Sequence, residues 1–436
     1  MNMSSESLAF LEEDILKNNT INSEAYNKFE VKRGLRNKDG SGVLAGLTHI
    51  SSVLGFHKVE GELMPIEGVL KYRGTPLKEI IEQAGPSDRY FFERICFLLL
   101  VGRLPSQAEF EPFLSYFIKN RELPDELLTH VIKAIPSKNI MNKLQTSISA
   151  LYAFDESADS MDPYENFLKA IRILAKLPLI LSYSYLSAFD SNPEYLSPPK
   201  GASQAEAFLY TLKKGAEISE EEINLMDLSL VLHAEHGGGN NSTFTTYVVS
   251  SSGSDIYSTL AAAVASLKGP LHGAANQKVM DMMSHLKENI SQWDDPTEVG
   301  AYLEKMVRKE VYDKSGKLFG LGHAVYTKSD PRAIVIREQA EKVVKQSQRE
   351  KELALYDLVA KLGPEVFQAV KKSDKVISPN VDFYSGLVYE CLGIPRELYT
   401  PMFAMARACG WCAHRIEESL SGKRIIRPGY KYIDVN

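Results

Sequence analysis

The chain has 436 residues, of which 44% are hydrophobic and 24% are charged, and it carries a net charge of −6. This length is enough for two domains with a sizeable core. Because no long run of like charge occurs, the composition argues against a nucleic-acid partner and against a membrane surface, so small-molecule ligands are expected.

The acidic start of the chain does not resemble a targeting peptide, and no apolar stretch is long enough to cross a bilayer. Four cysteines, Cys96, Cys391, Cys409 and Cys412, are too few for a disulfide framework in a chain of this length. These features predict a cytoplasmic protein. Cys409 and Cys412 have the spacing of some redox pairs, but their position inside a predicted helix favours two buried thiols.

Apolar residues recur with the 3.6-residue period of helices along most of the chain, so an all-α fold is expected. The clearest helical stretches are 90–101, 222–236 and 401–420. β-structure is expected only as a minor hairpin near the N-terminus, in residues 33–50 around Asp39 and Gly40 and in residues 68–74. Two segments are predicted as loops from their Pro, Ser and Asn content: 189–203 and 287–298.

Two histidines occur at the end of the second helical stretch. His233 falls on its apolar stripe, so a place in the core is expected. His236 comes just before three glycines, where free carbonyl groups at a helix end favour a cationic imidazole and a ligand could approach the backbone. Their His-x-x-His spacing matches no zinc-protease pattern, and no Cys/His cluster completes a site, so no metal is expected.

A third histidine, His272, follows Gly269 and Pro270 and precedes a helix predicted from Ala274 onward. The positive field of a helix N-terminus disfavours the imidazolium form. A neutral ring there can donate a hydrogen bond to a developing oxyanion. A histidine that only caps the helix is the alternative interpretation.

A fourth histidine lies in another glycine-rich turn. Gly320 and Gly322 predict a tight turn before His323, and Asp330 is expected to cap a helix that carries Arg332 in its first turn. His323 and Arg332 could therefore face one anion.

Asn380 is expected to cap a helix with Asp382 in its first turn, where the helix dipole stabilises an ionised carboxylate. The structural alternative is an aspartate that only favours the start of the helix.

Together these stretches resemble the citrate synthase family over nearly the whole chain. The resemblance runs from KRGLRNKDGSGVLAGLT to RIIRPGYKYI and includes, in order, HAEHGGG, GPLHG, GHAVY followed by DPR, and NVDFYSG. It implies an acyltransferase that condenses acetyl-CoA with oxaloacetate and hydrolyses citryl-CoA to citrate and CoA, with no permanently bound cofactor.

The resemblance also implies roles for single residues. Asp382 would remove a methyl proton from the acyl thioester, His272 would hold the enol oxygen, and His323 would polarise and protonate the ketone of oxaloacetate. The oxaloacetate-binding set would be His236, Arg332, Arg407 and, from the partner subunit of a homodimer, Arg427. The coenzyme A set would be Leu321, Gly322, Ala324, Val325 and Lys328, although Thr327 stands where the family often has a basic residue.

The family further implies a large helical domain, residues 1–275 and 388–436, and a small one, residues 276–387, that closes over the active site. The helix dipole is expected to keep Asp382 acidic and therefore a weak base. Closure would expel water, and this desolvation would make Asp382 a stronger base. Three alternatives stay open: a 2-methylcitrate synthase that uses propionyl-CoA, a non-catalytic paralogue that binds acyl-CoA or a dicarboxylate, and a citryl-CoA lyase. The lyase is disfavoured, because such lyases carry a similar core at the end of a much longer chain and no ligase module is found in this sequence.

Overall fold

The computed structural model describes residues 12–37, 39–59, 62–84, 88–422 and 424–433. By its internal contacts the chain divides into two units: a smaller unit, Met1–Leu47 with Ile426–Asn436, and a larger unit, Thr48–Ile425. The predicted small domain, residues 276–387, would be a subdivision of the larger unit, and it stays a prediction.

The smaller unit combines both ends of the chain. It contains α1 (Glu12–Asn19), α2 (Ser23–Lys28) and a short 3-10 turn, η2 (Arg33–Leu35). None of these elements buries a residue. The Lys431 ammonium group of the C-terminal tail lies 4.6 Å from the centre of the Phe29 ring, a cation–π contact that joins the two ends.

The larger unit is built mainly of helices, which confirms the predicted all-α class. Its α-helices are α3 (Leu77–Ala84), α4 (Phe91–Val101), α5 (Gln107–Lys119), α6 (Ile140–Ala150), α7 (Pro163–Phe189), α8 (Gln204–Leu212), α9 (Glu220–His233), α10 (Asn241–Ser251), α11 (Ile256–Lys268), α12 (Ala275–Asn289), α13 (Pro296–Val307), α14 (Pro331–Gln346), α15 (Glu350–Lys371), α16 (Val381–Cys391) and α17 (Tyr399–Ser421). Short 3-10 or π-helical turns are η3 (Leu127–Ile132), η4 (Leu151–Phe154) and η5 (Arg396–Leu398). The predicted loop 189–203 is correct except for its first residue, because it connects α7 and α8. The predicted loop 287–298 is too long, because only residues 290–295 lie between α12 and α13.

A small antiparallel sheet completes the larger unit. It has the order β1 (Ser51–Val59), β2 (Glu62–Tyr72), β3 (Thr75–Pro76). The expected β-structure in residues 68–74 is therefore correct, but its main partner is β1 and not the segment around Asp39 and Gly40. In the described part of that segment, the structure has only an isolated bridge between Arg36 and Gly42.

The sequence pattern misses β1 because Gly55 interrupts it, at a register shift between Leu54 and Phe56. The glycine is required by a close tertiary approach: a Cβ atom at Gly55 would lie 2.2 Å from the carbonyl oxygen of Val325. No local periodicity could reveal this contact.

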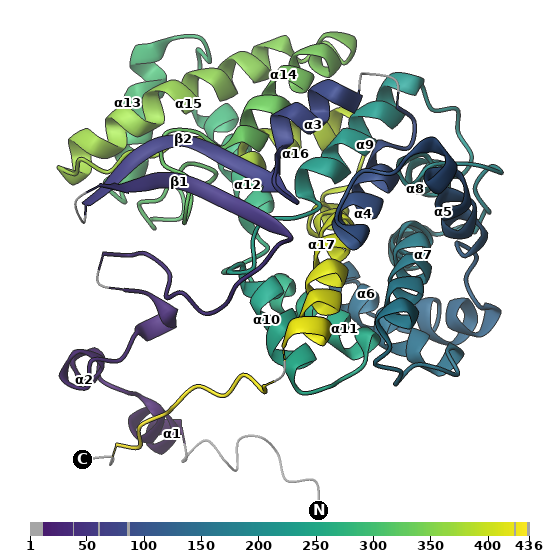
Figure 1. The fold of residues 1–436 in the computed structure, drawn as a ribbon. Helices are drawn as coiled ribbons and strands as arrows, with labels where there is room; N and C mark the ends of the chain where they lie inside the picture. Colours follow the sequence, from purple (N-terminus) through teal and green to yellow (C-terminus); the bar gives the residue numbers. More distant parts are fainter. Residues whose placement is uncertain (1–11, 38, 60–61, 85–87, 423, 434–436) are drawn as a thin grey trace, which may run out of the picture. The chain divides into compact units, whose positions relative to one another are not determined.

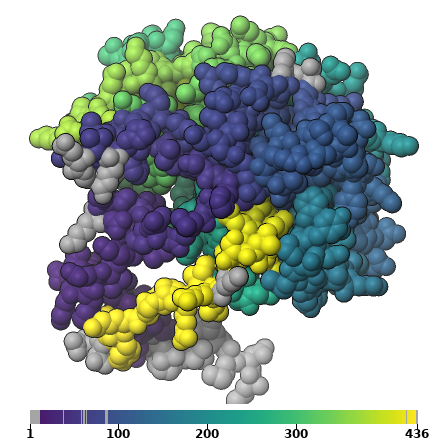
Figure 2. All heavy atoms as spheres, viewed as in Figure 1, coloured from purple at the N-terminus to yellow at the C-terminus, as the bar shows by residue number. Residues whose placement is uncertain are grey.

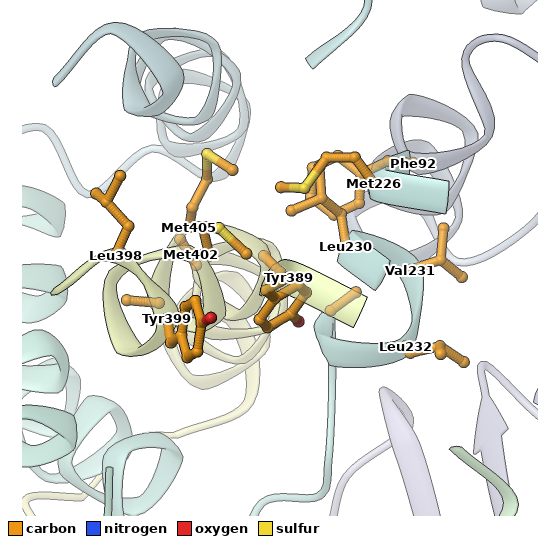
Figure 3. Packing of buried hydrophobic residues seen from close by; sticks show 14 of the residues in the cluster. Phe92, Met226, Leu230, Val231, Leu232, Tyr389, Leu398, Tyr399, Met402 and Met405 are labelled. Atoms are coloured by element: carbon orange, nitrogen blue, oxygen red, sulfur yellow. The ribbon is translucent and has the colours of Figure 1, made fainter. Parts of the chain in front are cut away.

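Helix α17 is the centre of the larger unit and packs against α4, α7, α9, α10 and α11 (Figure 1). Its residues Tyr399, Met402 and Met405 share a buried apolar cluster with Met226 of α9 and Tyr389 of α16 (Figure 3). Because α9, α16 and α17 are packed together through this cluster, side chains at their ends have fixed relative positions.

A second group of helices surrounds α16. Helix α14 packs against α15, α16 and β2, α12 packs against α16, and α13 packs against α15. Figure 2 shows α13 to α15, in green, as the upper surface of the larger unit in this view. The described part of the chain has no helix that is both long and apolar enough to span a bilayer.

Candidate active site

A cavity of about 320 Å³ lies where the ends of α9, α12, α14 and α16 approach α17. It brings together six of the predicted site residues: His236, His272, His323, Arg332, Asp382 and Arg407. A larger cavity, of about 450 Å³, lies among α3, α9 and α14 and is lined by none of these six. The chemistry expected from the sequence is therefore concentrated in the smaller cavity.

His272 lies in the turn between α11 and α12, three residues before α12 begins. The next residue must be a glycine, because a Cβ atom at Gly273 would lie 2.0 Å from the carbonyl oxygen of Leu267. Burial, helped by the positive charge of Arg407, lowers the pKa of His272 to about 4. The ring is thus neutral at physiological pH, as expected, although burial is the main cause.

The Nε2 atom of His272 lies 3.1 Å from the Ser242 hydroxyl, which in turn lies 2.9 Å from Oδ1 of Asn240. A hydroxyl can donate one hydrogen bond while it accepts others, so it can satisfy either tautomer of the ring. Ser242 was not among the residues predicted from the sequence. Its only local signal is its position just after the glycine-rich HGGGNN segment.

His323 lies in the predicted turn, where Gly320 and Gly322 have φ angles of 78° and 93°. Its Nδ1 atom accepts hydrogen bonds from the backbone N–H groups of Val325, at 3.0 Å, and Tyr326, at 3.1 Å. Burial and the nearby Arg332 lower the pKa of His323 to about 4. In the neutral ring the proton is therefore on Nε2.

His236 lies just beyond the end of α9 and is 7% exposed. The expectation of a cationic ring is wrong, because burial and the charge of Arg332 lower the pKa of His236 well below its ordinary value. Desolvation outweighs the weak field of the helix carbonyl groups. The ring meets that of His323 edge to face, with centroids 5.0 Å apart.

His233 is buried, as expected, but it also lines the cavity. Its Nε2 atom lies 3.0 Å from the Tyr389 hydroxyl, and its ring centroid lies 4.7 Å from that of Phe403. His233 therefore belongs both to the core and to the lining of the cavity, because the apolar stripe of α9 reaches the cavity at the end of that helix.

Arg332 is in the first turn of α14 and is 3% exposed. Asp330 caps this helix as predicted and also accepts two hydrogen bonds from the guanidinium group, at 3.0 and 2.8 Å. Burial alone would lower the pKa of Arg332, but Asp330 raises it, so the cation is stable. Asp330 also accepts the N–H group of Val381 and so links α14 to the start of α16.

Arg407 of α17 is completely buried, and its Nε donates to the carbonyl oxygen of His233 at 2.7 Å. Within the described residues its Nη1 and Nη2 atoms have no hydrogen-bond partner. Burial lowers the pKa of Arg407 to about 10, so the group is still charged at neutral pH. A buried cation with unpaired donors beside a cavity is suited to bind an anion.

Asp382 lies in the first turn of α16, capped as predicted by Asn380, whose Oδ1 accepts the Asp382 N–H group at 3.0 Å. Burial raises the pKa of Asp382 to about 6, although Arg332 and Arg407 oppose the shift. The expected effect of the helix dipole is therefore outweighed by desolvation. A carboxyl group with this pKa is a suitable general base near neutral pH.

The residues predicted to contact coenzyme A are divided by the structure. Gly322 and Ala324 line the cavity, whereas Leu321, Val325 and Lys328 are not among its lining residues. Lys328 is exposed. The Thr327 hydroxyl donates to the carbonyl oxygen of Gly55, at 2.5 Å, so this position anchors the loop to β1.

Two further predictions concern residues outside the cavity. Arg427 is an exposed residue of the smaller unit. Cys409 and Cys412 are free and completely buried in α17, and burial raises the pKa of Cys412, which agrees with two inert thiols. Within the described ranges no group of three or more His, Cys, Asp or Glu side chains could hold a metal ion.

Neutral histidines, an aspartate of raised pKa and buried arginines around one cavity are the features of an active site suited to acid–base chemistry on an anionic ligand. The model of the citrate synthase C-terminal domain matches residues 39–429. The chain therefore belongs to the citrate synthase family, whose members are acyltransferases that convert the acyl group into an alkyl group on transfer.

Individual relatives agree with this assignment. Citrate synthase 2 of Bacillus subtilis is 35% identical over 90% of this chain and 94% of its own length. A citrate/2-methylcitrate synthase of the same organism is 33% identical over 90% of this chain and 95% of its own.

Solved structures give the same result. The crystal structure of citrate synthase from Pyrobaculum aerophilum has a TM-score of 0.74 at 31% identity and covers 90% of this chain and 91% of its own. Citrate synthase from Thermoplasma acidophilum, in a ternary complex with carboxymethyl coenzyme A and oxaloacetate, has a TM-score of 0.77 at 27% identity and covers 93% and 96%.

Proposed function

We propose that this chain is a citrate synthase that condenses acetyl-CoA with oxaloacetate and hydrolyses citryl-CoA to citrate and CoA. The observation that carries the proposal is the arrangement of Asp382, His272 and His323 around one cavity with two buried arginines. The Thermoplasma acidophilum relative was solved with a coenzyme A derivative and oxaloacetate bound, which supports this choice of substrates.

The reaction begins with proton transfer from the acetyl group. Asp382 removes a methyl proton, for which its raised pKa suits it. The thioester oxygen then gains negative charge, and His272 stabilises it by donating a hydrogen bond. The low pKa of His272 keeps its ring neutral. A neutral imidazole can donate a hydrogen bond to the oxygen and still keep its proton.

The enolate carbon then attacks the ketone carbon of oxaloacetate. One carbon–carbon bond forms, the ketone π-bond breaks, and its oxygen takes the proton from Nε2 of His323, the nitrogen that the backbone leaves protonated. The proton taken up by Asp382 is then returned to His323, which restores both groups. Water next attacks the citryl thioester carbon, the carbon–sulfur bond breaks, and the departing thiolate takes one water proton, so that citrate, CoA and one proton are released.

Oxaloacetate is held through its two carboxylates. Arg332 and Arg407 supply buried charged donors, and the Nη atoms of Arg407, which have no partner among the described residues, can take this role. His236 contributes a neutral donor. Arg427 of the partner subunit completes the set, so we also propose a homodimer.

Residues 276–387 form the small domain that closes over the substrates in this proposal. His323, Arg332 and Asp382 belong to that domain, whereas His236, His272 and Arg407 belong to the large one. Closure would bring the two sets together and exclude water. Coenzyme A would bind along the turn from Leu321 to Lys328.

We propose a cytoplasmic location and no permanently bound cofactor. Free cysteines are typical of a reducing compartment. The proposed chemistry uses only hydrogen bonds, one carboxylate base and arginine charges.

One alternative has specific support, because a relative is named for both citrate and 2-methylcitrate synthesis. Acetyl and propionyl differ by one methylene, worth only about 1–3 kcal/mol in a pocket. Steady-state kcat/KM values for acetyl-CoA and propionyl-CoA with oxaloacetate decide between them. A higher value for acetyl-CoA is expected. A higher value for propionyl-CoA would make the chain a 2-methylcitrate synthase, and binding of both without product would make it a non-catalytic paralogue.

A further inference from the structure

We infer that Tyr326 is a positioning residue that determines which ring nitrogen carries the proton in both His236 and His323, so that each ring presents an N–H group to the ligand. The inference rests on the proposed function only for the ligand, oxaloacetate, whose carboxylate and ketone oxygens all accept hydrogen bonds.

Tyr326 touches both histidines from behind the cavity. It is 2% exposed and is not one of the residues that line the cavity. Its ring stacks on that of His323, with centroids 4.7 Å apart and planes at 29°. Its hydroxyl oxygen lies 3.2 Å from Nε2 of His236. The Tyr326 ring also lies beneath the Arg332 guanidinium group, 5.8 Å from the ring centroid, a contact that does not involve the hydroxyl. Through its hydroxyl, Tyr326 therefore reaches the cavity only by way of His236.

The backbone of Tyr326 acts on His323. Its N–H group and that of Val325 both point at Nδ1, and an N–H group can only donate. Nδ1 must therefore carry the lone pair, and a neutral His323 has its proton on Nε2. The stacked phenol ring limits rotation of the imidazole that would break these hydrogen bonds.

The side chain of Tyr326 acts on His236, for which two arrangements are possible. If the phenol donates to Nε2, the proton of His236 is on Nδ1 and can be given to a ligand. If His236 donates from Nε2, Nδ1 has only a lone pair, which cannot bind an acceptor such as a carboxylate.

The surroundings favour the first arrangement. Burial raises the pKa of Tyr326, so the phenol keeps its hydrogen. Within the described residues the structure gives its hydroxyl no hydrogen-bond partner other than His236. In the second arrangement this buried hydrogen would have no acceptor, which is unfavourable.

The small sheet holds Tyr326 in place. A Cβ atom at Gly55 would lie 2.7 Å from the Tyr326 Cα, and a Cβ atom at Gly68 would lie 2.8 Å from Cδ1 of its ring. Both strands of the hairpin thus approach Tyr326 closely enough to require glycine. This gives the only sheet among the described residues a function, which is to support the two histidines.

The test is ¹⁵N NMR of the ring nitrogens in ligand-free protein labelled with ¹⁵N-histidine, with signals assigned by loss in His236→Gln and His323→Gln. The expected wild-type spectrum shows His236 protonated on Nδ1 and His323 protonated on Nε2. A proton on Nε2 of His236 would overturn the inference. Because this measurement needs no turnover and no variant of Tyr326, failure of the proposed activity would not affect it.

Tyr326→Phe supplies the second measurement, since it keeps the ring and the backbone but removes the hydroxyl. His236 should shift toward the Nε2-protonated form while His323 is unchanged. Oxaloacetate binding, measured by calorimetry, should weaken by roughly 3- to 10-fold, the effect of one hydrogen bond. The matched control is Tyr183→Phe, which removes another buried hydroxyl, one that donates to the Leu196 carbonyl and is not at the cavity. If Tyr326→Phe changes only thermal stability, as the control should, its role is structural and the inference fails.

Discussion

The imidazole rings of His236 and His323 meet edge to face at 5.0 Å, one after the end of α9 and the other in the turn before α14. Both rings are neutral because they are buried beside Arg332. Two segments far apart in the chain thus place two neutral rings side by side, next to buried arginines that can attract an anion.

The first prediction concerns the proposed base. Asp382→Asn keeps the shape of the side chain but cannot accept the proton, so kcat should fall by about 10²–10⁴-fold. Oxaloacetate binding by calorimetry should be largely retained. Proton exchange of acetyl-CoA in D₂O should fall in parallel with kcat. The matched control is Asp357→Asn on α15, whose carboxylate pairs with Arg337 and does not line the cavity. Near-normal kcat in Asp382→Asn would mean that the base is another group.

The second prediction is the pH dependence of catalysis. Asp382 must be ionised to act, and burial raises its pKa to about 6, so kcat/KM should fall as the pH drops through about 6. His272 and His323, with pKa values of about 4, remain neutral over this range. A profile that stayed flat down to pH values near 4 would contradict the assigned environment of Asp382.

The third prediction is that Asp382 reduces stability at neutral pH. Its pKa rises from 3.8 in the unfolded chain to about 6 in the folded one, so between these values the folded state binds more protons and stability falls as pH rises. Asp382→Asn should therefore melt at a higher temperature than wild type above pH 6, and the difference should vanish near pH 4. Thermal unfolding at several pH values measures this. A variant that is less stable than wild type at neutral pH would argue against it.

The fourth prediction is that turnover needs no metal. The proposed mechanism uses a carboxylate, neutral histidines and arginines, each of which acts without a Lewis acid. Dialysis against EDTA and then against 1,10-phenanthroline should leave kcat unchanged. Loss of activity that zinc restored would require different roles for the histidines.

The fifth prediction is that Arg427 acts in the active site of the partner subunit. His272→Ala and Arg427→Ala should each be nearly inactive alone. In a mixed dimer one site carries both lesions and the other carries none, so random exchange should restore about a quarter of wild-type sites. Exchange is monitored with two affinity tags. If tagged subunits exchange and activity does not return, Arg427 acts within its own subunit or not at all.

Several site residues could be predicted from sequence because they lie in turns or in the first turn of a helix, which patterns of a few residues determine. Asp330 and Asn380 cap α14 and α16 as their positions indicated, and this places Arg332 and Asp382 in first turns. The glycines before His323 have the positive φ angles that their spacing suggested. Helix period, caps and turns depend on neighbours a few residues away, so the sequence contains them.

Charge states and supporting contacts were decided only by the tertiary structure. The helix field alone indicates an acidic Asp382 and a cationic His236, whereas burial makes the first weakly acidic and the second neutral. Likewise, Gly55 looks like a break in a strand until its approach to Val325 is seen. Desolvation and close packing depend on segments far away in the chain, and these act more strongly than the local fields that the sequence reveals.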